Sequence, residues 1–230
     1  MKKSNILIIC LIAFSFIAMI GSGLTLKSQF DKIDRKDPYY LFDKTTLGDF
    51  KYIRLSGNYH GTTKIMHGTE PKIMVAVIKN DDKTPIVTWK MSRDTLVINY
   101  KMTGNVAGFE EHQYDQLPNV YVVAPHLSGV FSQGITTFIE NIKADSFALE
   151  QKGFGVILKD NNFKKLTSTV ISGANLTIVK KNNLEQTKLR VTDSSSVHIE
   201  SDTFRSFQLT TDDSVQLNFP ASLFKKITTL

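Results

Sequence analysis

NNFKKL, at residues 161–166, is the first of four similar stretches in the second half of the chain. The later ones are NNLEQTKL at 182–189, DTFRSF at 202–207 and SLFKKI at 222–227. In each stretch a polar or small residue precedes a large apolar residue, and the stretches lie about 20 residues apart. A recurrence of this length is typical of chains that are built from stacked structural repeats.

Apolar residues repeat with the same period in three series, which we call ladders. The spacings are 21, 21, 20 and 20 residues in the first ladder and 20, 21 and 18 in the second. The third ladder follows two residues behind the second, as neighbours on one face of a β-strand do. The ladders are Ile142, Phe163, Leu184, Phe204 and Phe224; Val156, Leu176, Val197 and Val215; and Leu158, Ile178, Ile199 and Leu217.

Small and turn-forming residues separate the strands within each repeat. They are KGFG at 152–155, SGAN at 172–175, DSSS at 193–196 and TDDS at 211–214. A unit of about 20 residues with two or three short strands cannot bury its own apolar face, so it must stack on its neighbours. The sequence therefore predicts an all-β fold, a parallel, right-handed β-helix or solenoid. A β-sandwich of short antiparallel strands is the alternative.

In the predicted coils, three asparagines recur at one corner, where their amides would hydrogen-bond along the stack. These are Asn141, Asn162 and Asn183. The first part of the body also alternates like strands, and we expect it to pack on the coils or to continue into them. Trp89 alternates with Val87 and Met91, which favours a core position or one wall of a shallow groove.

The predicted organisation has four parts. Residues 1–26 form a signal peptide or membrane anchor, and residues 27–46 a polar linker. Residues 47–219 form the solenoid, with front strands at 47–124 and regular coils at 125–219. Residues 220–230 form a partial coil or cap, in which Lys225 and Lys226 would protect the edge from pairing with other strands.

The N-terminus has the layout of an export signal. Lys2 and Lys3 precede an uninterrupted apolar run at residues 6–20, and this pairing of a basic and an apolar region is typical of a signal peptide. We interpret it as a cleaved signal; an anchor that continues to Leu26 is the alternative. The single cysteine, Cys10, lies inside this run, which excludes a disulfide framework in the exported part.

Composition narrows the class of partner. Hydrophobic residues make up 41% of the 230 residues, which is enough for a folded core. The formal net charge of +6 falls to +4 without Lys2 and Lys3, and the remaining charges are scattered. Nucleic-acid binding requires a dense basic stripe, so we expect no nucleic-acid partner. Lysine doublets such as Lys164 with Lys165 are interpreted as solvated residues of turns.

No motif in the sequence predicts catalysis, a cofactor or a metal site. The five histidines, at 60, 67, 112, 126 and 198, do not have the spacing of metal ligands. The glycines of SGNYHG at 56–61 and TGNVAG at 103–108 are not followed by a helix signal, as a phosphate loop requires. We therefore expect no catalytic, cofactor-binding or metal-binding residues.

One enzymatic alternative rests on acidic residues at the predicted corners. Asp193, Asp212 and Asp213 fall at equivalent positions of successive coils, so their carboxylates could lie close together. Paired carboxylates serve as acid and base, or hold a cation, in enzymes that cleave polysaccharides. Aspartate is also common in turns for conformational reasons, and we regard the corner as structural.

The order of motifs resembles the head GIN domain, a DUF2807-type, auto-transporter adhesin family of exported Bacteroidetes proteins. The resemblance spans residues 47–219. It rests on LGDFKYIRLSGNYHGTTKIMHG at 47–68, on the strands KIMVAVI and TLVINY, on NVYVVAPHLSGVFSQGITTF at 119–138, and on corners such as SGAN. The resemblance implies a β-helical domain of the cell envelope that has no established enzymatic activity.

The predicted function is thus adhesin-like binding of an envelope protein or a glycan by an exported solenoid. We expect it in the periplasm, at the outer membrane or on the surface of a Gram-negative bacterium, touching a membrane only through residues 6–26 if these are retained. The predicted binding surface consists of Lys159, Lys180, His198 and Gln216. A carbohydrate-active enzyme and a structural envelope spacer are the alternatives.

Overall fold

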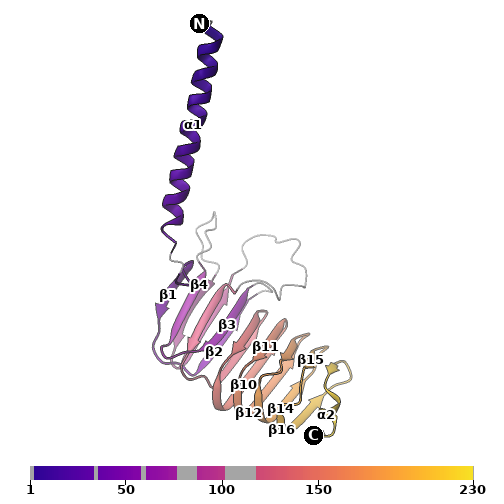
Figure 1. Cartoon of the computed structure of the whole chain (residues 1–230). Coiled ribbons are helices and arrows are strands. Elements are labelled where there is room, and N and C mark those ends of the chain that lie inside the picture. The colour runs from indigo at the N-terminus through magenta and orange to yellow at the C-terminus, as the bar shows by residue number, and fades with distance from the viewer. Residues whose placement is uncertain (1–2, 34–35, 58–60, 77–86, 102–117, 230) are drawn as a thin grey trace. The chain divides into compact units, whose positions relative to one another are not determined.

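The computed structural model describes residues 3–33, 36–57, 61–76, 87–101 and 118–229. The chain forms two compact units, Met1–Leu41 and Phe42–Leu230 (Figure 1). In the first unit, helix α1 (Lys3–Phe30) contains the apolar run and ends four residues beyond the predicted signal segment. Its residues 5–30 are long and apolar enough to cross a membrane, a property that signal sequences share.

The second unit is mostly β, as predicted, and consists of two mixed sheets of nine strands. Sheet A has the order β1 (Phe42–Thr46), β4 (Lys72–Ala76), β7 (Val120–Ala124), β3 (Thr62–His67), β9 (Thr136–Glu140), β11 (Gly155–Lys159), β13 (Asn175–Ile178), β15 (Ser196–Ile199) and β17 (Gln216–Asn218). Sheet B has the order β18 (Ile227–Thr229), β16 (Phe204–Thr211), β14 (Asn183–Val191), β12 (Asn162–Ile171), β10 (Lys143–Lys152), β8 (Gly129–Gln133), β2 (Tyr52–Ser56), β6 (Thr95–Tyr100) and β5 (Val87–Ser92).

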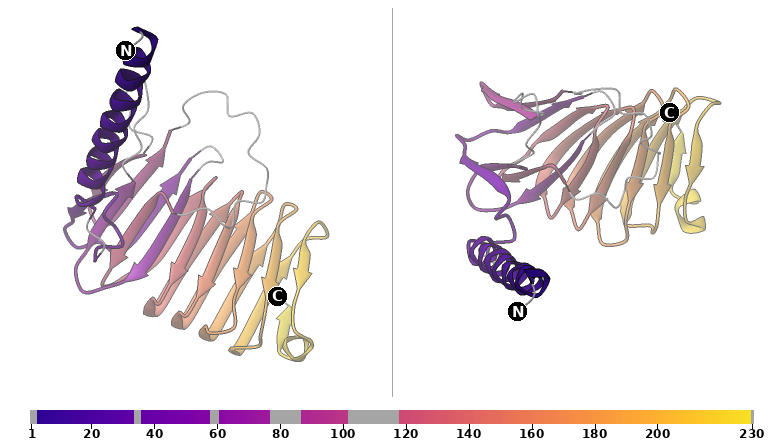
Figure 2. Two further views of the ribbon diagram at one scale, coloured as in Figure 1. Left: turned by 45° about the horizontal axis from the view of Figure 1, so that its top comes forward. Right: turned by 90° about the horizontal axis from the view of Figure 1, so that it is seen from above.

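From β8 to β18 the chain alternates between the two sheets, and we call each circuit through both sheets a coil. Within each sheet, strands of successive coils pair in parallel, for example β12 with β14 and β13 with β15. Figure 2 shows these strands side by side in two facing layers. The pairing explains the period of the sequence, because Asn162 lies opposite Asn183 and Phe163 opposite Leu184, 21 residues later.

The predicted corners join the strands of sheet B to those of sheet A. Three of them contain two consecutive residues with positive φ: Gly153 and Phe154, Ser172 and Gly173, and Asp193 and Ser194. This left-handed conformation costs little for glycine and is tolerated by short polar side chains. Turn chemistry therefore accounts for the glycine, serine and aspartate of the corners.

The core between the sheets contains most of the ladder residues, but the first ladder needs correction at both ends. Phe163, Leu184 and Phe204 are in register, whereas Ala144, not Ile142, lies opposite Phe163. Ile142 is buried beside this position. Phe224 is 61% exposed in the short helix α2 (Ala221–Phe224), where Leu223 is the buried residue instead.

The second and third ladders also differ from the prediction at the last coil. Leu217, not Val215, lies opposite Val197, so Leu217 belongs to the second ladder and not to the third. The predicted step of 18 residues would break the parallel register, whereas the step from Val197 to Leu217 preserves it. Leu217 is 36% exposed because it lies in the edge strand of sheet A.

The asparagine corner is only partly as predicted. Asn183 donates from Nδ2 to Oδ1 of Asn162 at 3.1 Å, but Asn141 is not part of this row. Asn141 has a φ of 59° and precedes β10, which begins opposite Asn162 at Lys143. A second, buried row consists of Asn161 and Asn182, 1% and 4% exposed, whose amides bond to each other at 3.1 Å.

The front of the second unit is less regular than the coils. Strands β2 and β3 join the coils in parallel, whereas β1, β4 and β7 are connected by antiparallel pairs, as are β5 and β6. Strand β1 consists of residues 42–46, the last five residues of the predicted polar linker. Trp89, in the edge strand β5, is half-buried against the core, within the range predicted for it.

Candidate binding surface

The four predicted surface residues all lie on the side of sheet A or in its turns, and all are exposed. Lys159 ends β11, His198 is in β15, Gln216 begins the edge strand β17, and Lys180 follows β13 in a turn. Their registers differ: His198 lies opposite Thr177 and Asn218, whereas Lys159 lies opposite Glu140. The fold therefore places them on one side without gathering them into a cluster.

The fold brings the residues of the acidic corner together, but the carboxylate of Asp212 already accepts hydrogen bonds within the turn. Asp212 accepts hydrogen bonds from the Ser214 hydroxyl at 2.6 Å, the Asp193 backbone N–H at 2.8 Å and the Ser214 backbone N–H at 2.9 Å. These bonds, that of the Ser214 hydroxyl foremost, lower the pKa of Asp212 below its usual 3.8. A carboxylate held ionised in this way is unsuited to act as a general acid. Asp213 is exposed beside it.

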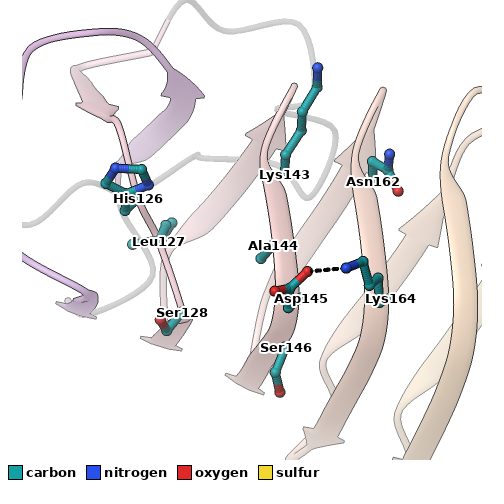
Figure 3. Close-up of a pocket in the computed structure, with 9 residues that line it drawn as sticks. All are labelled: His126, Leu127, Ser128, Lys143, Ala144, Asp145, Ser146, Asn162 and Lys164. Atoms are coloured by element: carbon teal, nitrogen blue, oxygen red, sulfur yellow. Dashed lines mark ion pairs between the residues drawn. The ribbon is translucent and has the colours of Figure 1, made fainter.

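A surface hollow of about 530 Å³ lies beside β10 and β12 (Figure 3). Its lining includes His126, Lys143, Asp145, Asn162 and Lys164. Nζ of Lys164 lies 2.7 Å from Oδ1 of Asp145, and the hydrogen bond and charge of Asp145 raise the pKa of Lys164. Both side chains are largely exposed, so the hollow is a polar depression of the surface and not a shielded cavity.

The hollow lies where the strands of sheet B bend. In β12 the neighbouring residues Lys164 and Lys165 are both exposed, and Lys164 is skipped in the register with β10. These two lysines, interpreted as turn residues from the sequence, are therefore inside a strand. The skipped positions of successive coils alternate in charge. They are Asp145, Lys164, Glu185 and Arg205.

The outer side of sheet B contains an aromatic pair that the sequence did not reveal. The rings of Tyr52 in β2 and Phe131 in β8 are 6.3 Å apart, and the Arg54 guanidinium lies 6.0 Å from the centre of the Phe131 ring. Gly129 lies between Tyr52 and Ala148, and a Cβ there would come within 2.9 Å of the Ala148 carbonyl oxygen. Glycine thus allows the backbones and the tyrosine ring to pack closely.

Basic residues follow the aromatic pair along the same side of sheet B. We call the outward residues of β2 and β8, and of β10, β12, β14 and β16 beyond their bends, the sheet B face. Its charged residues are Arg54, Lys152, Lys165, Lys188 and Arg190, against a single acid, Glu150. Glu150 pairs with Lys152 at 3.0 Å. Within the described part of the chain, Lys165, Lys188 and Arg190 have no ion-pair partner.

A simple signal could have found part of this surface. Tyr52 and Arg54 alternate with buried Ile53 and Leu55, as residues on the outside of a half-buried strand do. The pairing of Tyr52 with Phe131, however, depends on the register of β2 with β8, which the repeat does not determine. Among the described residues no group of histidine, cysteine, aspartate and glutamate is placed to hold a metal ion. His60, His112 and the segment 103–108 lie outside the described residues, as do residues 58–60 of SGNYHG.

Comparisons with known proteins give fold likenesses at low identity. No family model matches the chain, and no curated protein matches it. A structure from Parabacteroides distasonis described as a "putative lipid binding protein" is 11% identical, with 82% of this chain and 96% of that chain covered and a TM-score of 0.46. A "putative adhesin" from Bacteroides fragilis is 11% identical, with 82% and 94% covered and a TM-score of 0.36. A "putative adhesin" from Parabacteroides merdae is 14% identical, with the same coverage and a TM-score of 0.34.

Proposed function

We propose that the protein is an exported, non-enzymatic, adhesin-like binding protein of the cell envelope, with a head GIN-type β-solenoid as its binding domain. Its ligand would be a protein or a glycan of the periplasm, the outer membrane or the cell surface. The observation that carries the proposal is the in-register stacking of outward side chains over successive coils, because it builds extended flat surfaces from short repeats.

The solenoid assignment is supported by the path of the chain. Successive strands from β8 to β18 alternate between the sheets, and their parallel registers advance by one coil at a time. We take the winding as right-handed, because connections between parallel strands nearly always are. Solenoids of this kind present long surfaces that suit extended ligands.

The envelope assignment is supported by the N-terminus and by the sequence motifs. Helix α1 combines an apolar stretch with a basic start, which is the composition of a segment that is inserted into or guided across a membrane. The motifs at 47–68 and 119–138, which resemble the head GIN domain, lie in strands and turns of the second unit. Both features favour a binding domain that functions outside the cytoplasm.

The proposal is tested by a binding screen of the full chain, kept soluble in a mild detergent, against envelope fractions and a panel of glycans. The expected result is saturable binding of at least one component without its turnover. Fractionation of the cells that produce the protein should place it in the envelope. A wholly cytoplasmic location would contradict the proposal. Absence of binding to every fraction would also contradict it, and would favour a structural spacer.

The enzymatic alternative is tested in the same screen through the acidic corner. We expect no release of unsaturated or reducing sugar ends by the native chain. Release that is abolished in the Asp193→Ala, Asp212→Ala double variant, while an Asp213→Ala variant still folds and acts, would establish the alternative. The occupied carboxylate of Asp212 is the observation against it.

A further inference from the structure

We propose that the sheet B face binds an acidic polysaccharide, which lies across the strands with a sugar ring on the Tyr52–Phe131 pair and its carboxylates toward Lys188 and Arg190. This inference rests on the function proposed above, because it names the ligand class and the face. It differs from the surface predicted from the sequence, which lies on sheet A.

The aromatic pair provides the place for a sugar ring. Tyr52 and Phe131 are only partly buried, and their rings are tilted by 42° to each other on the outside of the sheet. Sugar rings have C–H faces that pack on aromatic surfaces, while their hydroxyl groups remain at the rim for hydrogen bonds. Arg54, above the Phe131 ring, and Gln133, exposed two residues further along β8, are placed to reach such groups.

The charges of the sheet B face indicate that the ligand is negatively charged. Its basic residues outnumber its single acid, Glu150, and that acid is already paired with Lys152. Lys188 and Arg190 are exposed, two positions apart on β14, and therefore point to the same side. Arginine and lysine bind carboxylates through charge-assisted hydrogen bonds, so the face is complementary to a chain of uronic acids.

The geometry of the sheet matches an extended ligand. Phe131, Glu150, Thr169 and Arg190 lie opposite one another on four successive strands. Neighbouring strands are about 4.8 Å apart, which is close to the length of one sugar unit in an extended polysaccharide. The aromatic pair and Arg190 are thus separated by about 14 Å across three strand spacings. One polysaccharide of a few units would reach both.

Sheet A has an aromatic pair as well, Phe42 in β1 and Tyr121 in β7 with ring centroids 5.1 Å apart, but its basic residues lie beside acids. Its outward lysine Lys64 is neutralised by Glu140 at 2.7 Å, and Lys159 lies opposite that same acid. The backbone of Lys180 is bonded to the Glu200 carboxylate, which places a further acid nearby. Carboxylates therefore accompany these basic residues of sheet A, whereas the sheet B face has five basic residues and a single acid.

The test measures binding of a linear oligogalacturonate to the full chain in mild detergent by isothermal titration calorimetry. The matched ligand is the methyl-esterified form, which keeps the sugar backbone and removes the charge. We expect Lys188→Gln with Arg190→Gln to weaken binding of the acid by about tenfold or more. Phe131→Ala should weaken both forms. The matched control, Lys159→Gln with Lys180→Gln, removes the same charge from sheet A and should change affinity by less than about twofold.

Several results would overturn the inference. Equal loss in the sheet A control, or equal binding of polyglutamate or of vesicles containing an anionic phospholipid, would show attraction to negative charge without recognition of a sugar. Binding of a neutral glycan or an envelope protein, with none of the oligogalacturonate, would overturn the inference and leave the proposed function standing. Failure of every fraction and glycan to bind would overturn both.

Discussion

The front and the back of the second unit are built on different rules, although they share both sheets. In the back, β10 to β17 pair only in parallel, and each coil places apolar side chains above those of the preceding coil. In the front, β7 and β6 pair in parallel with β3 and β2, and antiparallel pairs then add β4 and β1 to one sheet and β5 to the other. The repeat in the sequence therefore marks the uninterrupted parallel stacking of the back.

The difference shows which part of the second unit tolerates changes of sequence. A coil in the back is constrained by the coils on both sides, so its buried residues must match in position. A front strand is constrained by hydrogen bonds to its partner and by the core, but not by a repeat. The aromatic pair of the sheet B face forms where the two regions meet, between β2 and β8.

The largest effect should come from a charge inside the back ladders. Val197, 2% exposed, lies opposite Leu176 and Leu217. Val197→Asp, or Leu176→Asp, buries a carboxylate without a partner and should lower the free energy of unfolding by about 4 kcal/mol or more. Hydrogen exchange should show the back coils opening while β2 and β6 keep their protection, if the front is held together by its own pairs.

The control for this prediction is His198→Asp, which places the same charge on the outward side of the same strand. It should leave thermal melting almost unchanged. An unchanged melting temperature in Val197→Asp or Leu176→Asp would contradict the assigned inside of the coils. Simultaneous loss of protection in β2 and β6 would show that the front depends on the back.

A smaller loss of stability is expected when the buried asparagine row, Asn161 and Asn182, is interrupted. This row lies in the corners of the back coils. Oδ1 of Asn161 accepts from the Ile142 backbone N–H at 2.9 Å, and its Nδ2 donates to the Ile139 carbonyl at 2.8 Å. Asn161→Ala leaves these buried groups unpaired and should cost about 2 kcal/mol in chemical denaturation. Asn162→Ala, which removes only an exposed amide bond, should cost less than about 0.5 kcal/mol. Equal costs would mean that burial of the row does not matter.

The sequence predicted the interior of the back better than its ends. Phe163 and Leu184, or Val156, Leu176 and Val197, repeat because each has a coil on both sides that enforces its register. The errors at Ile142, Val215 and Phe224 lie in the first or last coils. There a neighbour is missing or of another kind, so an apolar residue at the right spacing need not be in the ladder.

The front strands were also predictable, because alternation identifies a strand whatever its partner. The pairing of these strands was not, since a period of two residues contains no information on which strand lies alongside. The choice of surface residues from the sequence was limited for the same reason. Exposed Lys159 and His198 can be chosen from alternation alone, whereas the meeting of Tyr52 with Phe131 requires the register of the sheet.

An effect of acid pH is expected at the last corner. Hydrogen bonds lower the pKa of Asp212 in the folded chain, so its contribution to stability is complete above its usual pKa of 3.8 and is lost as the pH falls through the lowered value. The amide of Asp193, which donates to this carboxylate, should therefore keep its protection factor at pH 4 and lose it at lower pH, after correction for the slower intrinsic exchange in acid. Asp212→Asn should remove the pH dependence of this amide, as followed by NMR. Loss of protection above pH 4 in the native chain would contradict the lowered pKa.

The smallest effect is expected at the bend of sheet B, where Asp145, Lys164, Glu185 and Arg205 alternate in charge. Asp145→Asn should lower the pKa of Lys164 toward its usual 10.5, measured by NMR, because the Asp145 hydrogen bond is the main cause of its rise. The melting temperature should move by no more than about 1 °C, since exposed ion pairs contribute little to stability.

The reversal Asp145→Lys should have a clearer effect than Asp145→Asn, because it places two ammonium groups side by side on neighbouring coils. Lys164→Asp in the same chain restores the ion pair between these two positions but places a carboxylate beside Glu185, so it should recover the melting temperature only in part. Alternate charges of this kind contribute little to stability while opposing a slip that would skip a coil and bring Asp145 beside Glu185. The four charged residues at the bend would then favour pairing of each coil with the next coil along the chain. The apolar ladders do not make this choice, because they are similar in successive coils.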